Sequence, residues 1–441
     1  MVLAMKKFFG MLLGAALCLP AWAGVQIQQW VAPTGARVLF VESRVLPIVD
    51  IQVDFAAGSA YDPADKVGLA AFTKGLLDAG AGELDEEALA GKLADTGAQL
   101  GGVMDADRAG LSLRTLSSSK ERQAAVELMR LILSRPTFPT TPLERERERA
   151  IAAIREAETQ PASVAAKRFS ASVYPAHPYG YVATEVAARR ITREDLIEFH
   201  RKHYAAGRAV VSIVGDLSRA EAETLAMQLT EGLPKGPGDG TVASVTLPPA
   251  ATVRVAHPST QAHVYLGTPG LKRIDPDYYP LVVGNYILGG GGFVSRLMKS
   301  VREQRGLAYS VHSYFMPQKE LGAFQIGLQT KVDQADEALA VVNATLREFL
   351  DKGPSAAELQ AAKRNIIDGF VLRIDSNRKL LDHVAVIGFY GLPLSYLEDY
   401  PRHVAAVSAV QIRDAFARRL RAEHMVTVVV GGKNGEGARA P

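Results

Sequence analysis

Residues 288–315 read LGGGGFVSRLMKSVREQRGLAYSVHSYF, and the expected fold and function depend on this stretch more than on any other. It contains a run of four glycines: Gly289, Gly290, Gly291 and Gly292. Glycine has no Cβ atom, so the run permits positive φ angles and the close approach of another chain. A flexible turn before a helix that begins at Ser295 would by itself explain two of the four. Because the run lacks the Gly-Lys-Ser/Thr ending of a phosphate-binding loop, it argues against nucleotide binding.

The same stretch carries two polar side chains, Arg302 and Tyr309, which are seven residues apart. Taken as residue types alone, Arg302 is interpreted as an arginine on the surface of a helix. Tyr309 is interpreted in the same way as a strand tyrosine half buried in a sheet. Neither interpretation requires a ligand.

Composition describes a globular protein of more than one domain. The 441 residues are 48% hydrophobic and 22% charged, which is enough for two or three domains that each bury a core. Fifty basic residues against 47 acidic ones leave a net charge of +3. No basic stripe long enough to follow a phosphate backbone is present, so nucleic acid is not expected as a partner.

The first 23 residues have the pattern of a secretory signal peptide. Lys6 and Lys7 precede an apolar run over residues 8–19, and the A-x-A triplet at residues 21–23 predicts cleavage before Gly24. The apolar run is shorter than the roughly 20 residues that a membrane-spanning helix needs. We therefore expect a protein exported across the inner membrane to the periplasm, without a membrane span. Translation could begin at Met1 or at Met5.

The single cysteine, Cys18, lies inside this segment. It could be a lipid-attachment cysteine, although Leu17 is larger than the residue that such processing prefers before the cysteine. A mature chain without cysteine excludes disulfides, thiolate catalysis and Cys-ligated metals.

A Pro- and Gly-rich segment divides the mature chain near its middle. It predicts a first domain over residues 24–233, a linker over 234–250, a second domain over 251–435 and a tail over 436–441. The halves resemble each other weakly. An alternating strand at 48–55 leads to Asp62-Pro63, and a strand at 263–267 leads to Asp275-Pro276, 213 residues later. Long charged helices are predicted over 142–159 and 355–374, so we expect a duplicated α/β unit.

The histidines offer little evidence for a metal site. Of the nine, only His200 and His203 have a metal-like spacing, on a helix predicted over residues 193–204. A zinc site needs a third ligand and usually an acid beside the bound water, and no Asp or Glu lies between these two. We interpret them as solvent-facing histidines near a helix end. The alternating Glu and Arg run at 144–149 is interpreted as a solvated helix face with ion pairs between neighbouring turns.

Beyond these patterns, residues 288–315 closely resemble the second-domain signature of the pitrilysin and mitochondrial processing peptidase family of zinc peptidases. The resemblance extends over nearly the whole mature chain through HPYGY (177–181), VVSIVGDL (210–217) and GLPLSYLEDYPRHVAAVSAVQIRDAF (391–416). It implies an α+β fold of two similar domains, each a mostly antiparallel sheet with helices packed on one face.

In active members of that family a helix begins with G-L-A-H-x-x-E-H, in which two histidines bind zinc and the Glu activates water. The matching stretch here is GLAAFTKG at residues 68–75. Ala71 and Gly75 stand at the histidine positions and Lys74 at the Glu position, while the third ligand position falls at Ala152 or Ala153. The resemblance implies that this chain alone binds no cofactor and hydrolyses no peptide.

The family also gives Arg302 and Tyr309 a role. In family members this pair reaches from the second domain to the zinc site of the other half, where it hydrogen-bonds the substrate carbonyl and the developing oxyanion. The resemblance therefore implies the non-zinc subunit of a heterodimeric periplasmic metallopeptidase, with zinc in a paralogous partner. The glycine run would contact the peptide substrate, although it is shorter here than in non-catalytic processing-peptidase subunits.

Two alternatives remain open. The chain could be an inactive scaffold with a peptidase fold, or a self-pairing chaperone that binds unfolded peptide segments without cutting them. A neighbouring reading frame encoding a similar secreted protein with H-x-x-E-H would favour the subunit.

Overall fold

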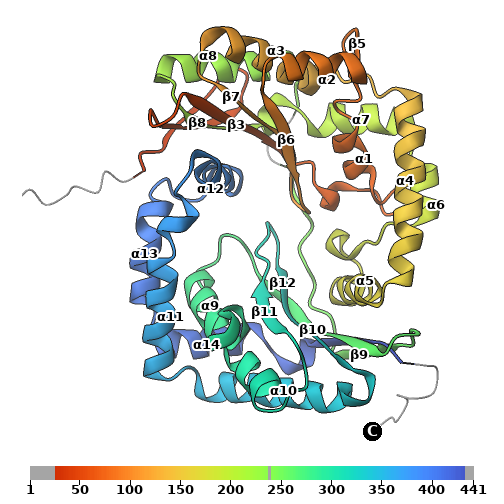
Figure 1. Cartoon of the computed structure of the whole chain (residues 1–441), viewed down its shortest axis with the longest axis vertical. Coiled ribbons are helices and arrows are strands. Elements are labelled where there is room, and N and C mark those ends of the chain that lie inside the picture. The colour runs from red at the N-terminus through yellow and green to blue at the C-terminus, as the bar shows by residue number, and fades with distance from the viewer. Residues whose placement is uncertain (1–24, 237–239, 433–441) are drawn as a thin grey trace, which may run out of the picture.

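The computed structural model describes residues 25–236 and 240–432. The predicted signal peptide at 1–23 and the tail at 436–441 lie outside these residues. Figure 1 shows two sheets at opposite ends of the long axis, joined by helices along both sides. Within the described ranges, no helix combines the length and the apolar character that crossing a bilayer would require.

The first sheet has six strands, and all neighbouring pairs are antiparallel except β2 and β8. In spatial order the strands are β1 (Gln28–Val31), β2 (Arg37–Glu42), β8 (Val210–Gly215), β3 (Ile48–Phe55), β7 (Ala109–Leu116) and β6 (Gln99–Met104). A small separate hairpin pairs β4 (Gly80–Ala81) with β5 (Leu84–Asp85).

The second sheet has five strands, and only β13 and β9 are parallel. Its spatial order is β11 (Val311–Phe315), β12 (Gly322–Lys331), β10 (Gln261–Leu271), β13 (Val426–Val430) and β9 (Ala251–Val255). Read from the opposite edge, β9-β13-β10-β12-β11 repeats the order β2-β8-β3-β7-β6 of the first sheet, including the position of the one parallel pair. The duplicated unit expected from the sequence is therefore confirmed.

Four of the eight helices described in the first half begin with a side-chain cap, from Asp85, Thr184, Thr192 and Ser218. Thr192 with Asp195, and Ser218 with Glu221, form reciprocal capping boxes at the starts of α7 and α8. The helices are α1 (Leu69–Gly75), α2 (Glu86–Asp95), α3 (Ser119–Ser134), α4 (Thr140–Thr159), α5 (Pro161–Val173), α6 (Glu185–Arg190), α7 (Arg193–His203) and α8 (Arg219–Thr230).

The charged run on α4 makes the ion pairs expected of a solvated face. Arg147 pairs with Glu144 at 3.0 Å and Arg149 with Glu146 at 3.9 Å, each three residues apart. Arg145 instead reaches Glu86 at the start of α2.

Among its described residues, the second half contributes six further helices: α9 (Tyr278–Asn285), α10 (Ala335–Lys352), α11 (Ala356–Asp368), α12 (Asn377–Tyr390), α13 (Tyr396–Ala406) and α14 (Ala409–Arg419). Short 3-10 turns occur at Ser59–Tyr61, Pro178–Gly180, Ala206–Arg208, Gly292–Val294, Val332–Gln334, Val371–Arg373 and Ala422–His424. The helix predicted to reach residue 374 ends earlier, at Asp368, where Gly369 follows. Glycine has a low helix propensity, which favours the break at this point.

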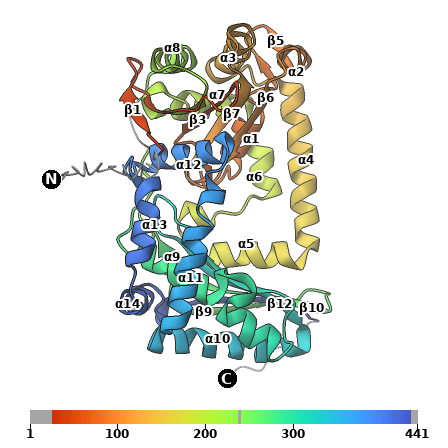
Figure 2. The same ribbon diagram turned by 60° about the vertical axis from the view of Figure 1, so that its left-hand side comes forward.

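Each half lends one helix to the sheet of the other half. α12 packs on β2, β3 and β8 of the first sheet, and α5 packs on β10 and β13 of the second. A glycine permits each close approach: a Cβ at Gly388 would lie 2.5 Å from the Leu39 side chain, and one at Gly267 would lie 2.8 Å from Phe169. Figure 2 shows both helices lying against the sheets they cover. Burying a side chain such as Phe169 in this way contributes about 1.5–3 kcal/mol.

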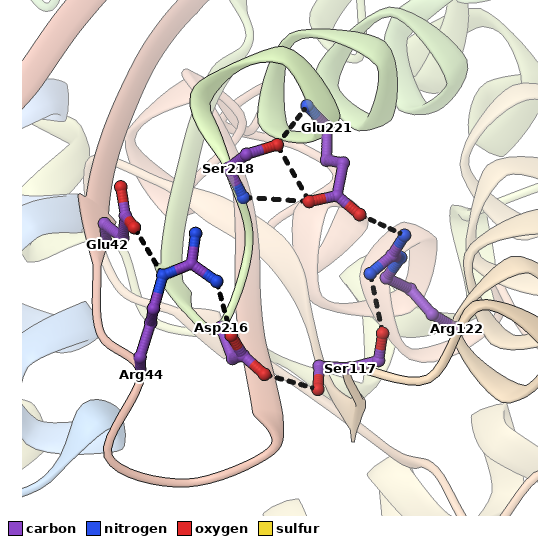
Figure 3. A network of polar contacts seen from close by, with 7 residues as sticks. All are labelled: Glu42, Arg44, Ser117, Arg122, Asp216, Ser218 and Glu221. Atoms are coloured by element: carbon purple, nitrogen blue, oxygen red, sulfur yellow. Dashed lines mark hydrogen bonds and ion pairs between the residues drawn. The ribbon is translucent and has the colours of Figure 1, made fainter.

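A network of hydrogen bonds and ion pairs connects loops at one end of the first sheet (Figure 3). Asp216 accepts from Arg44 at 3.3 Å and from Ser117 at 2.9 Å, and Arg122 pairs with Glu221 at 2.9 Å. These bonds connect the β2–β3 loop to the segments that begin α3 and α8. Surface pairs of this kind contribute at most about 1 kcal/mol each, so the network fixes the loops more than it stabilises the fold. It contains none of the predicted site residues.

Candidate functional site

The buried side of α1 is well formed. Gly68 precedes the helix with a φ of 107°, and the Asp62 carboxylate accepts hydrogen bonds from the Gly68 and Ala70 N–H groups, both at 2.7 Å. Burial raises the pKa of Asp62 to about 6, while the two backbone hydrogen bonds act in the opposite direction. Phe72 and Thr73 lie in the core on the inner face of the helix. The helix that carries the catalytic residues in active family members is therefore well formed here at its backbone and on its buried face.

The outer face of α1 carries no ligating side chain. Ala71 and Gly75 are exposed, and a Cβ at Gly75 would meet no atom within 4 Å. The Lys74 side chain lies along β6, where its Cε is 3.1 Å from the position of a Cβ on Gly102. Neither Ala nor Gly offers a lone pair to a metal ion, and an ammonium repels a cation.

The third ligand position is equally bare. Ala152 and Ala153 are exposed on α4, which runs past α1 in Figures 1 and 2. Ala153 lines a cavity of about 450 Å³ together with parts of α5 and the segment 179–183. Across the described ranges, no group of three or more His, Cys, Asp or Glu side chains is arranged to hold a metal ion. The residues present do not fit the zinc ion that the resemblance associates with this position.

His200 and His203 are not solvent-facing, so that interpretation was wrong. Both are buried on the inner face of α7, with exposed fractions of 6% and 4%. His200 Nε2 lies 2.8 Å from the Leu133 carbonyl oxygen, and His203 Nδ1 lies 3.1 Å from that of Ala56. Burial lowers the pKa of His203 to about 4. Each ring makes a hydrogen bond with a backbone carbonyl inside the protein. The sequence pattern had instead predicted that the ring nitrogens contact water.

The glycine run lies at a junction of irregular helical turns. A π-helical segment spans Tyr286–Gly290, and the 3-10 turn Gly292–Val294 follows it. A Cβ at Gly289 would lie 2.4 Å from the Ser313 hydroxyl oxygen, and one at Gly291 would lie 2.6 Å from the Tyr286 carbonyl oxygen. Packing therefore accounts for these two glycines.

The other two glycines differ. A Cβ at Gly290 would lie 2.7 Å from Asn285 Nδ2, the end of a side chain. Gly292 has a φ of 62° with open space around it, so its backbone conformation is what favours glycine there. Before Ser295 the run therefore has two parts, a packed part at Gly289 and Gly291 and an exposed 3-10 turn at Gly292–Val294.

Arg302 and Tyr309 lie together on the surface. Arg302 is in a second π-helical segment, Met298–Glu303, and Tyr309 precedes β11 by two residues. Tyr309 is 82% exposed, so the interpretation of a half-buried strand tyrosine was wrong. The Arg302 guanidinium carbon lies 4.8 Å from the centre of the Tyr309 ring and 4.9 Å from that of Phe293. Within the described residues Arg302 has no carboxylate partner, and two aromatic faces hold it instead.

Phe293 is the residue that sequence reasoning missed. It is 64% exposed, which is unusual for phenylalanine, and it directly follows the glycine run. An aromatic residue between a glycine-rich turn and a retained arginine was the available signal.

Comparison with known proteins agrees with this geometry. Residues 37–184 match the family model described as Insulinase (Peptidase family M16), and residues 190–366 match the one described as Peptidase M16 inactive domain. The chain belongs to the M16 peptidase family. Its α+β fold of two similar domains is that of the family, and the chain is a peptidase-fold protein of the inactive kind.

Similar proteins extend over almost the full length. The chain is 26% identical to the "Non-peptidase homolog YmxG" of Helicobacter pylori, over 97% of this chain and 99% of that protein. A crystal structure from Pseudomonas fluorescens, described as a peptidase M16 inactive domain, is 37% identical with a TM-score of 0.89, covering 93% of this chain and 98% of that one. The periplasmic protease PqqL of Escherichia coli shares the fold at 18% identity and a TM-score of 0.77, over 98% of this chain and 49% of that chain.

Proposed function

We propose that this chain is the non-zinc subunit of a heterodimeric periplasmic zinc metallopeptidase. Its partner is a paralogue that carries H-x-x-E-H and the zinc ion, and this chain binds no metal. The description of the H. pylori relative as a non-peptidase homologue and the bare outer face of α1 support an accessory role. The location of the E. coli protein supports a periplasmic one.

The Arg302 and Tyr309 pair is the observation that carries the proposal. A tyrosine that is 82% exposed buries little apolar surface, and an arginine without a carboxylate partner adds little to stability. Both side chains are hydrogen-bond donors that remain available to a ligand. In the assembled enzyme, Arg302 donates to a carbonyl oxygen of the peptide and orients it. The Tyr309 hydroxyl donates to the oxygen on which negative charge develops. Donors held in place before the reaction stabilise such charge by about 2.7–4 kcal/mol.

The test is reconstitution with the zinc-bearing partner. The purified chain would be mixed with the secreted paralogue, and cleavage of a fluorogenic peptide measured. Arg302→Ala and Tyr309→Phe are each expected to lower kcat/KM by about 100-fold, which corresponds to about 2.7 kcal/mol of barrier. The matched control is Arg347→Ala, an exposed arginine on α10, which is expected to leave the rate unchanged. If both site variants stay within twofold of the wild type, the catalytic role is wrong.

Binding of peptides without cleavage is the second candidate. The outer edge of β6 is not paired with another strand in the described chain, and β6 lies beside α1 through Lys74 and Gly102. Such an edge can accept an extended peptide through main-chain hydrogen bonds that depend little on sequence. Fluorescence anisotropy of a labelled, unstructured peptide with this chain alone separates the two candidates. Micromolar binding that is indifferent to Arg302→Ala and Tyr309→Phe would favour the chaperone.

A further inference from the structure

A cationic pocket lies where the two halves meet, away from α1 and from Arg302. Its volume is about 390 Å³. It is formed by β2, by the segment after β10, by the turn between β11 and β12, and by the end of α12. Its charged lining residues are Arg37, Lys272, Arg273 and Lys319, and the rest of the wall is Ile274, Phe389, Tyr390 and Gly391.

Three of the four cations have no carboxylate partner among the described residues. Lys272 is paired with Glu320 at 2.8 Å. Arg37 donates to the Gly388 carbonyl oxygen at 2.8 Å, and Lys319 Nζ donates to that of Gly240 at 2.6 Å. A neutral carbonyl satisfies one N–H group without cancelling the charge of the cation.

Arg273 is the least satisfied of the four. Its guanidinium carbon lies 5.2 Å from the centre of the Tyr390 ring. Its Nε atom is buried and has no hydrogen-bond partner in the described chain. A buried donor without a partner costs about 1–3 kcal/mol, so Arg273 is the least compensated cation in the wall of the pocket.

A buried carboxylate beside the pocket, that of Asp107, already accepts hydrogen bonds with both of its oxygens. Asp107 is fully buried and accepts from the Tyr179 hydroxyl at 2.5 Å, from the Tyr390 hydroxyl at 2.8 Å and from the Lys319 backbone N–H at 2.7 Å. These donors come from both halves and use both oxygens of the carboxylate. Asp107 therefore fixes the wall of the pocket and forms no ion pair with the cations that line it.

We propose that this pocket is a binding site for an oxyanion group, a carboxylate or a phosphate. Guanidinium groups match the planar, paired oxygens of such anions, and a lysine adds a point charge. The volume admits a small molecule larger than a single inorganic ion. Because the wall comes from both halves, the bound anion joins the first sheet and α12 to the second sheet. The inference does not depend on a catalytic role for Arg302 and Tyr309.

Isothermal titration calorimetry on the full chain tests the site, with pyrophosphate and citrate as probes and chloride at matched ionic strength as the blank. At least one probe is expected to bind one to one with a Kd of about 1 mM or tighter. Arg273→Gln and Lys319→Met should each weaken that binding at least tenfold. The controls Arg413→Gln and Lys352→Met remove exposed cations elsewhere in the second half and should stay within twofold.

The two probes identify the chemistry, since preference for pyrophosphate indicates a phosphate ligand and preference for citrate a carboxylate ligand. Circular dichroism checks that each variant is folded. If Arg273→Gln does not fold, Arg37→Gln and Lys319→Met provide the same comparison. No binding tighter than about 1 mM by either probe, or equal binding by folded site variants and controls, would overturn the proposal.

Discussion

The start of α1 and the turn before β11 differ in what the fold requires of them. At α1 the inner face is complete: Asp62 binds two backbone N–H groups, and Phe72 and Thr73 are buried. Among the described residues, its outer face carries no side chain that could bind a metal ion. At the turn before β11 the reverse holds, because Tyr309 is exposed and contacts the Arg302 guanidinium, and the core would be intact without either side chain.

This difference separates residues that build a site from residues that do chemistry in it. The start of α1 is held by core packing and by the hydrogen bonds of Asp62, and neither involves a zinc ligand. Arg302 and Tyr309 bury little surface, so packing alone does not require them, and the function proposed above would account for their presence. Four measurements test this difference between the two regions.

The largest effect is expected from restoring the ligands at α1. A variant combining Ala71→His, Lys74→Glu and Gly75→His with either Ala152→Glu or Ala153→Glu should bind one zinc ion. Positions 71 and 75 are exposed and the space at 75 is open, so the new side chains can be accommodated. We expect a Kd of about 1 µM or tighter for one of the two variants, or about 8 kcal/mol, by competition with a chelator. Failure of both would mean that the outer face is not aligned for a metal.

The next effect concerns the core beneath α1. Phe72→Ala removes a side chain that is 6% exposed and should lower the free energy of unfolding by about 3–5 kcal/mol. Urea denaturation followed by circular dichroism measures it. Ala71→Ser, one residue away on the outer face, is the control and should change stability by less than about 0.5 kcal/mol. Equal effects would show that the two faces of the helix are not distinct.

The stability of the protein should depend on pH through Asp62, whose carboxylate binds two backbone N–H groups at the start of α1. The pKa of Asp62 is raised from 3.8 to about 6 in the folded state, so the folded chain binds more protons than the unfolded chain between these values. Stability from this group is therefore full below pH 4 and is lost as pH rises to 6, by up to about 3 kcal/mol. The difference in unfolding free energy between wild type and Asp62→Asn should fall over that range. A difference that is constant from pH 4 to pH 7 would contradict the raised pKa of the buried Asp62 carboxyl.

The smallest effect is expected at the exposed pair. Arg302→Ala, Tyr309→Phe and Phe293→Ala should each alter the free energy of unfolding by less than about 0.5 kcal/mol, because the side chains bury little surface. Thermal denaturation monitored by circular dichroism would detect a larger change. A loss above about 1 kcal/mol at Arg302 or Tyr309 would give those residues a structural role and remove the contrast with α1.

Much of the fold could be predicted from the sequence. The strand at 48–55 was predicted with its observed bounds, and the helix predicted over 142–159 begins only two residues earlier in the structure. Alternation and helical periodicity report which residues are buried, so they locate elements well. These patterns do not show which other element covers the buried residues. The exchange of α5 and α12 between the halves was therefore not predicted, although both helices have apolar faces.

The features of the candidate site also fall into two groups, those that the sequence could predict and those that depend on packing. The residue identities at 71, 74 and 75 predict that zinc ligands are absent from these positions, because the donor atoms of a side chain can be read from its identity alone. The exposure of Tyr309, the contact of Phe293 with Arg302 and the burial of His200 depend on tertiary packing. No spacing rule in a single sequence contains that information.

The exchanged helices also set an order on folding during synthesis. Arg37 in β2 donates to the carbonyl oxygen of Gly388 in α12, and 351 residues separate the two. In the complete fold α12 covers the apolar face of β2 and β8, so we expect the first half to finish folding only after α12 has been synthesised. Contacts this distant in sequence slow folding. If the chain is exported as its sequence predicts, this delay would help keep it unfolded until it reaches the membrane channel.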